Sequence, residues 1–132
     1  MATIQKFEDL EVWKKARELS RKIYPLTYEA PIVNDFRIRD QIRGSVGSVM
    51  DNIAEGFERG SKLEFINCLT ISKGEVGELK SQLYRCFDNN YISEKVFNEL
   101  YGLADEITKM LTGFINYLNK SAFKGQKFKK RS

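Results

Sequence analysis

Residues 62–88 read KLEFINCLTISKGEVGELKSQLYRCFD, and the spacing of their apolar and small residues decides the fold class. These residues recur at alternating steps of four and three: Phe65, Leu69, Ser72, Val76, Leu79, Leu83 and Cys86. This is a heptad seam, the pattern by which a helix of a bundle buries one face. Ser61 followed by Glu64 is a capping-box pattern, so we expect the helix to begin just after Ser61.

Three further segments have the same helical spacing. We therefore expect four helices, over about residues 9–28, 35–59, 62–88 and 94–120. Pro25 should kink or end the first helix, and Asn34 or Asp35 should cap the second. Gly60 suits the short turn after the second helix, and Ser93 should cap the fourth. The predicted fold is all-α: an antiparallel up-and-down four-helix bundle over residues 1–120, followed by a basic tail over residues 121–132.

Length and charge describe one domain with an uneven distribution of charge. A chain of 132 residues is enough for a single core. The net charge is 22 − 18 = +4, but residues 121–132 hold five Lys and Arg and no acid, which leaves 17 − 18 = −1 for residues 1–120. We find no apolar run long enough to span a bilayer and no signal-peptide layout. We expect a cytoplasmic protein without membrane contacts.

Catalytic chemistry has few candidates in this chain. Histidine is absent, which excludes Ser-His and Cys-His nucleophiles and the Glu-x-x-His pattern of di-iron bundles. Glu75 and Glu78 lie near Lys73 and Lys80, where ordinary ion pairing along a helix is the expected role. Cys68 and Cys86 are 18 residues apart on one predicted helix, about 27 Å, which is too far for a disulfide bond. We expect no enzyme activity, no cofactor and no metal.

The glycines of residues 43–61, RGSVGSVMDNIAEGFERGS, are unusual within a predicted helix. Gly56 falls within the apolar stripe and is predicted to be a packing site. Gly102 and Gly113 are three turns apart and are predicted to face outward; with the off-seam residues Ile66 and Tyr84 they form a candidate oligomer interface. The alternative is that the glycines only ease helix crossing within one bundle or are simply tolerated.

Asn52 and Glu55 form an unusual polar pair in the same stretch. Asn52 borders the predicted core, and we expect its side chain to hydrogen-bond across helices and set their register. A functional role for this pair is the alternative.

Basic residues give the candidate contacts to nucleic acid. In the second helix these are Arg39, Arg43 and Arg59; in the tail they are Lys124, Lys127, Lys129, Lys130 and Arg131. The tail also contains Phe123 and Phe128, which suit stacking on bases. There are two alternatives. In one, the helices carry an ordinary surface of mixed charge, on which acids are interspersed among basic residues such as Arg17, Arg21 and Lys22 of the first helix. In the other, the tail serves only to keep the protein in solution.

Three segments carry a family resemblance: LEVWKKARELSRKIY, QIRGSVGSVMDNIAEGFERGS and EFINCLTISKGEVGELKSQL. Over residues 7 to 120 the chain resembles the four-helix bundle proteins encoded within intervening sequences of bacterial 23S rRNA genes. The most specific element is Asn52 to Gly56, with Glu55 inside it and Arg59 after it. These residues transfer as family markers, and the resemblance supplies no catalytic residue.

The resemblance also implies an assembly and a class of partner. It implies a ring, typically a homopentamer, and a more distant similarity to the accessory variability protein of diversity-generating retroelements, a pentameric bundle that binds nucleic acid together with a reverse transcriptase. The leading hypothesis is a non-enzymatic oligomeric bundle that binds RNA or DNA as a scaffold or chaperone. The alternative is a protein-interaction module that docks a partner such as a polymerase without contacting nucleic acid.

Overall fold

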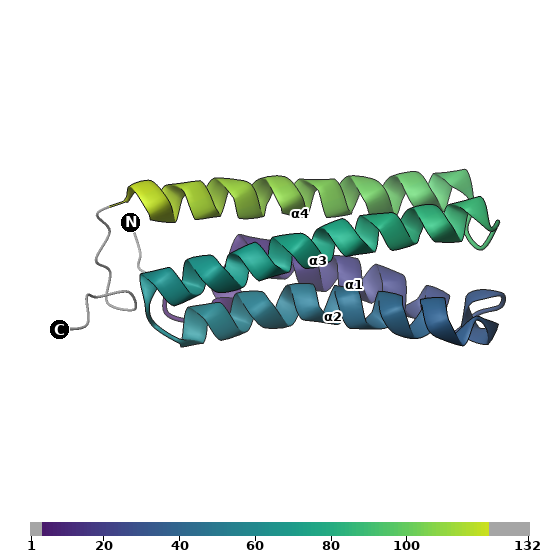
Figure 1. The fold of residues 1–132 in the computed structure, drawn as a ribbon, viewed down its shortest axis with the longest axis horizontal. Coiled ribbons are helices and arrows are strands. Elements are labelled where there is room, and N and C mark those ends of the chain that lie inside the picture. The colour runs from purple at the N-terminus through teal and green to yellow at the C-terminus, as the bar shows by residue number, and fades with distance from the viewer. Residues whose placement is uncertain (1–3, 122–132) are drawn as a thin grey trace.

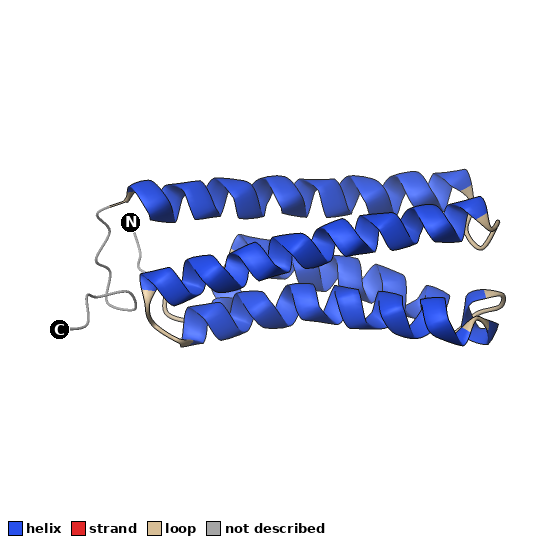
Figure 2. Cartoon of the chain, viewed as in Figure 1, coloured by secondary structure: helices blue, strands red, loops and turns tan. Residues whose placement is uncertain are grey.

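The computed structural model describes residues 4–121, and every regular element within that range is helical (Figures 1 and 2). In chain order the elements are η1 (Phe7–Asp9), α1 (Glu11–Thr27), η2 (Ile32–Asn34), α2 (Phe36–Glu58), α3 (Lys62–Asp88) and α4 (Glu94–Lys120). The four predicted helices are confirmed, two of them at the expected bounds and two within two residues of them. The predicted basic tail after Ser121 lies outside the described residues.

The four α-helices form an up-and-down bundle. Each helix packs on the next along the chain, and α4 closes the bundle by packing on α1. α3 begins at the end of the bundle where α2 stops and where α4 finishes (Figure 1). At that end the Lys62 ammonium donates a hydrogen bond to the Ser121 carbonyl oxygen at 3.0 Å. The predicted fold class is therefore confirmed.

Serine side chains cap the starts of α3 and α4. The side chains of Ser61 and Ser93 accept hydrogen bonds from the backbone N–H groups of Glu64 and Val96, three residues on in each case. Gly60 joins α2 to α3 with φ of 75°, a left-handed conformation that glycine adopts without steric cost. These local signals explain why the helix bounds can be read from the residues.

Asp35 caps α2 and also ties it to the turn between α3 and α4. One carboxylate oxygen accepts the backbone N–H of Ile38 at 3.3 Å, and the other accepts the Tyr91 hydroxyl at 2.7 Å. The Tyr91 hydroxyl, followed by the Ile38 N–H, lowers the pKa of Asp35 because both stabilise the carboxylate. Of the two predicted N-cap residues, Asn34 and Asp35, it is Asp35 that caps α2.

The core follows the predicted seams. All seven seam residues of α3 are buried, and aromatic rings fill the layer near the α2–α3 turn. Phe65 contacts Phe57 and Phe114 edge-on, with ring centroids 5.9 and 5.2 Å apart, the arrangement that aromatic quadrupoles favour.

Gly56 is a packing site, as predicted. A Cβ atom placed on Gly56 would lie 2.6 Å from the Cβ of Cys68 and 3.0 Å from the ring of Phe65. α2 and α3 approach each other here as closely as a hydrogen side chain allows.

The end of α1 differs from its prediction. Pro25 lies inside α1, which continues to Thr27, two residues further on. Leu26 is only half-buried, whereas Thr27 is completely buried. Thr27 can occupy the core because its hydroxyl is satisfied there: it donates to the Tyr24 carbonyl at 2.7 Å and accepts from the Arg43 guanidinium at 2.8 Å.

Both cysteines lie in α3, buried and unpaired, as expected. Burial raises the pKa of both thiols, that of Cys86 to about 11. They behave as small apolar residues of the core.

Candidate nucleic-acid interface

The exposed side of α1 carries the clearest basic surface. Three side chains with spacings of three and four lie on one side of the helix: Lys14, Arg17 and Arg21. We call these three residues the α1 basic face. Together with Glu18 and Lys22 they line a shallow hollow of about 440 Å³.

The charges of α1 are only partly compensated by acids. Lys14 pairs with Glu11 at 3.2 Å, and Lys22 pairs with Glu99 of α4 at 3.0 Å. Both pairs are exposed, so they contribute little and can exchange for another anion. No salt bridge within residues 4–121 engages Arg17 or Arg21, and Arg17 lies over the Trp13 ring at 5.9 Å.

Arg43, a predicted contact residue, joins α2 to the end of α1. Its guanidinium donates to the side-chain oxygen of Thr27 at 2.8 Å and to the Thr27 carbonyl at 3.3 Å. It also lies over the Tyr28 ring at 4.6 Å and the Tyr24 ring at 5.7 Å. Arg43 therefore holds two helices together while it adds positive charge beside α1.

Arg39 lies at the same end of the bundle as Arg43. It donates to the Asp40 carboxylate at 2.9 Å and to the Val33 carbonyl at 3.4 Å, and it covers the Phe36 ring at 4.8 Å. The rings beside these two arginines are unusually open: Tyr28 is 66% exposed and Phe36 is 65% exposed.

Arg59 lies apart from Arg39 and Arg43. Sixteen residues of helix separate Arg43 from Arg59, about 24 Å at 1.5 Å per residue. Arg59 donates to the Glu55 carboxylate, at 3.1 Å from its Nε atom, and to the Glu64 carboxylate at 3.0 Å. The hydrogen bonds that Arg59 donates to Glu55, and then to Glu64, raise its pKa because they stabilise the charged guanidinium.

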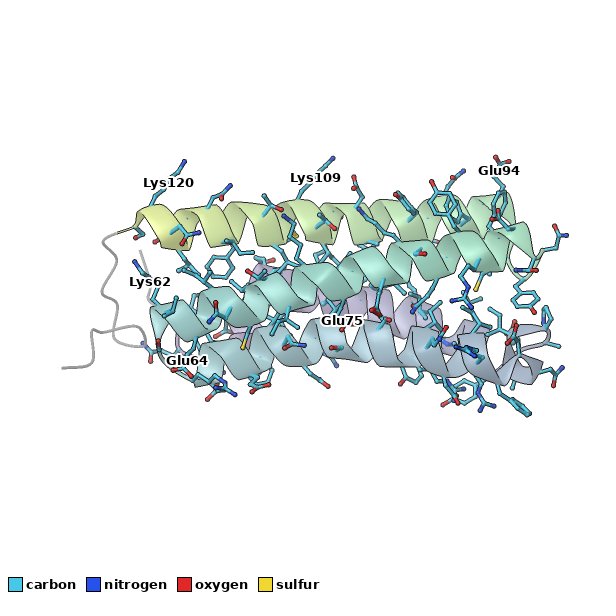
Figure 3. The ribbon with its side chains drawn as sticks, in the orientation of Figure 1. Lys62, Glu64, Glu75, Glu94, Lys109 and Lys120 are labelled. Carbon is cyan, nitrogen blue, oxygen red and sulfur yellow. The ribbon has the colours of Figure 1, made fainter. Side chains whose placement is uncertain are left out.

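The pairing of Arg59 gives the family marker a structural role. Glu55 and Arg59 at the end of α2 connect to Glu64 in the first turn of α3, beside Lys62 (Figure 3). Two carboxylates compensate one guanidinium, which leaves little attraction for a phosphate. Among the described residues, the structure therefore does not join Arg59 with Arg39 and Arg43 in one basic surface.

Asn52 does not hydrogen-bond across helices, so that prediction is wrong. Its side-chain amide donates to the carbonyl and hydroxyl oxygens of Ser48, one turn earlier in α2, at 2.9 and 3.0 Å. The buried cross-helix bond is made by Ser72, whose hydroxyl donates to the Val49 carbonyl at 2.8 Å. A short hydroxyl inside the seam reaches the neighbouring backbone, whereas Asn52 at the border finds an acceptor in its own helix.

The residues of the candidate oligomer interface have different surroundings. Gly102 and Gly113 are exposed, and a Cβ atom on either would meet nothing within 4 Å. Ile66 is half-buried against the core. Tyr84 is 49% exposed and packs on Phe97 and Tyr101, with ring centroids 4.9 and 5.4 Å away. Of these four candidate residues, only the two glycines are exposed without packing on a neighbouring side chain.

Most helix-interior glycines are not required for a close approach of helices within one subunit. Added Cβ atoms would also meet nothing within 4 Å at Gly44, Gly47, Gly74 and Gly77. Glycine therefore eases helix crossing at Gly56. It does not do so at these four positions or at Gly102 and Gly113.

Some candidate residues cannot be located, and others were missed. The predicted contacts in the tail, Lys124, Lys127, Lys129, Lys130 and Arg131, lie outside the described residues. The α1 basic face was not selected from the sequence, although the spacing of Lys14, Arg17 and Arg21 marks one side of a helix. In the sequence, acidic residues close to these three make the segment read as one of mixed charge. The structure shows that Arg17 and Arg21 form no salt bridge with those acids.

The described residues contain neither a metal-binding cluster nor a membrane-spanning helix. No group of three or more Asp, Glu or Cys in residues 4–121 could hold a metal ion. None of the described helices is long and apolar enough to cross a bilayer.

Comparisons with known proteins agree with this architecture. No curated protein matches the chain. A crystal structure from Bacteroides thetaiotaomicron, described as a protein with unknown function from the S23 ribosomal protein family, is similar with a TM-score of 0.68 and 27% sequence identity. The match covers 79% of this chain and 97% of that one. The model of the 23S rRNA-intervening sequence protein family matches residues 8–113. This match, together with the four-helix bundle that the chain forms, shows that the chain belongs to the 23S rRNA-intervening sequence protein family.

Proposed function

We propose that this bundle binds the phosphate backbone of RNA or DNA through the α1 basic face, as a scaffold or chaperone without a catalytic step. The observation that carries the proposal is that Arg17 and Arg21 are exposed on one side of α1 and engaged in none of the described salt bridges. A guanidinium binds phosphate with two parallel hydrogen bonds, which makes arginine well suited to this contact.

The dimensions of the α1 basic face suit a nucleic-acid backbone. From Lys14 to Arg21 the helix rises about 10.5 Å, a length over which a duplex carries about six phosphates. Arg43 adds a further charge near the end of α1, beside the open Tyr28 ring. The family is named for intervening sequences of 23S rRNA, which makes structured RNA the first ligand to test.

The proposed compartment is the cytoplasm. Cys68 and Cys86 are unpaired thiols, and such thiols persist where the environment is reducing.

Salt dependence of binding tests the proposal. We would measure fluorescence anisotropy of labelled structured RNA and duplex DNA at low and high salt with the full chain, Arg17→Gln/Arg21→Gln, and a chain ending at Ser121. Because each phosphate contact releases counterions, the double variant should weaken binding about tenfold and lower the logarithmic salt slope by about two. Lys95→Gln/Lys109→Gln on the exposed side of α4 is the control, since it removes the same net charge (Figure 3).

The outcomes separate the possible contacts. Binding that is absent at low salt, or indifferent to salt, would overturn the proposal and favour a protein partner such as a polymerase. Equal losses in the two double variants would mean that net charge matters and the α1 basic face does not. Loss of binding only in the chain ending at Ser121 would assign the contacts to the tail.

We also propose a homo-oligomer, a ring of five subunits if the family resemblance extends to assembly. A glycine inside a helix costs about 1 kcal/mol relative to alanine, and Gly102 and Gly113 gain no close approach within one subunit in return. Close packing of a neighbouring copy would supply that gain.

Substitution of Gly113 tests the assembly. Gly113→Trp should reduce the mass measured by sedimentation equilibrium to that of a single chain, because the indole would hold the neighbouring backbone away. Gly113→Ala serves as the control, because it changes the helix propensity at the same position without adding a large side chain. An unchanged mass for Gly113→Trp would contradict an interface at this position.

A further inference from the structure

A polar groove runs between α2 and α3, away from the α1 basic face. Its volume is about 540 Å³, within the range of small-ligand sites. α2 contributes Gln41, Gly44, Ser45 and Ser48, and α3 contributes Glu75, Glu78, Ser81, Gln82 and Arg85. Gly44 keeps one wall open, because a Cβ atom there would meet nothing within 4 Å.

Gln82 lines this groove and carries a buried, unsatisfied acceptor. The residue is only 6% exposed, and its Oε1 atom has no hydrogen-bond partner among the described residues. Buried side-chain oxygens are almost always hydrogen-bonded, because an unmade bond leaves the cost of desolvation uncompensated. A donor that enters the groove, with a rotation of the amide, would satisfy it.

The two carboxylates of the groove form no ion pair among the described residues, and the groove holds one positive charge, on Arg85. Glu75 lies near the middle of α3 (Figure 3), and Glu78 follows it by one turn. The expected pairing with neighbouring lysines does not form, because Lys80 reaches across to Asp105 of α4 at 2.9 Å. Burial, and then the charge of Glu78, raise the pKa of Glu75.

The residues that line the groove determine which charge and which hydrogen-bonding groups a ligand must have. At the far end of the groove Arg85 donates to the Gln41 side-chain oxygen at 3.0 Å, so the acceptors left available are carboxylates, hydroxyls and the Gln82 amide. Calcium needs six to eight oxygen ligands, and no carboxylate cluster of that kind exists within residues 4–121. A primary ammonium supplies one positive charge and three N–H donors.

We propose that the α2–α3 groove binds a primary alkylammonium group, with the ammonium at Glu75 and Glu78 and a donor turned toward Gln82. This site is independent of the proposed binding of nucleic acid. The ammonium has two sources: a free amine such as a polyamine, or a lysine side chain of residues 122–132.

Binding of n-butylammonium, the isolated side chain of lysine, tests the chemistry. We would titrate it into the isotope-labelled chain and follow backbone amide shifts, with n-butyltrimethylammonium as the comparison because it keeps the charge and the alkyl chain but has no N–H donor. Shifts should concentrate at residues 41–48 and 75–85 and be much smaller with the trimethyl compound. Equal affinity for the two compounds, or shifts spread over carboxylates elsewhere, would overturn the proposal.

Two variants and a control locate the site. Glu75→Gln should weaken binding about tenfold, since it removes a charge-assisted hydrogen bond. Gln82→Leu should weaken binding without lowering the melting temperature, because it also removes an unsatisfied buried amide. Glu94→Gln at the start of α4 should leave binding unchanged (Figure 3). Unaltered affinity in both groove variants would contradict the site.

A chain ending at Ser121 distinguishes the two sources. If tail lysines occupy the groove, the shorter chain should bind n-butylammonium more tightly than the full chain, and its groove signals should differ before any amine is added. If the ligand is a free amine, both chains should bind n-butylammonium and spermidine with equal affinity. Absence of binding in both chains would overturn the proposal.

Discussion

Gly56→Leu should lower the free energy of unfolding by about 3 kcal/mol, because the core between α2 and α3 has no room for a side chain at this position. The added Cβ atom alone would lie 2.6 Å from the Cβ of Cys68, an atom fixed to the backbone of α3. Relief therefore requires the two helices to move apart, not merely one side chain to rotate. Urea unfolding followed by far-UV circular dichroism measures the change.

Gly47→Ala, in the same helix, should stabilise the protein where Gly56→Leu destabilises it. Nothing lies within 4 Å of a Cβ atom at Gly47, so the higher helix propensity of alanine should raise the free energy of unfolding by up to about 1 kcal/mol. Similar destabilisation by Gly56→Leu and Gly47→Ala would show that α2 needs glycine for its backbone, and would contradict close packing as the reason for Gly56.

Phe65→Ala should lower the free energy of unfolding by about 3–5 kcal/mol, because it removes a fully buried ring and leaves a cavity. The change also removes the edge-on contacts with Phe57 and Phe114, which connect α3 to both neighbouring helices. The same urea measurement applies, at a protein concentration where the assembly state is known.

Leu63→Ala is the matched control for Phe65→Ala. Leu63 lies two residues earlier in α3 and is 67% exposed, so its truncation should change stability by less than about 0.5 kcal/mol. If Leu63→Ala costs as much as Phe65→Ala, Leu63 must be covered in solution, and a neighbouring copy would be the first explanation to test.

Three features lie on different parts of the described surface. The α1 basic face carries positive charge, the α2–α3 groove carries acceptors and negative charge, and α4 presents Gly102 and Gly113. Because these features lie on different helices, each can be altered without the others. The stability, binding and assembly experiments therefore test separate properties of the bundle.

Sequence by itself determined the helices and most of the core. The seam of α3, the capping residues Ser61 and Ser93, and the turn at Gly60 are local signals, and each acts as predicted. Local signals suffice for helices because the backbone hydrogen bonds and the periodicity of the buried face involve residues only three or four positions apart.

Only the tertiary structure decided where the polar side chains go. Arg59 turns to Glu55 and Glu64, Lys80 crosses to α4, and Asn52 bonds to its own helix. Each of these side chains could have reached several partners, and the choice depends on which helix lies beside it and how closely. The groove at Gln82 arises for the same reason: its empty space and missing donor belong to the packing of two helices, which no local spacing in either one encodes.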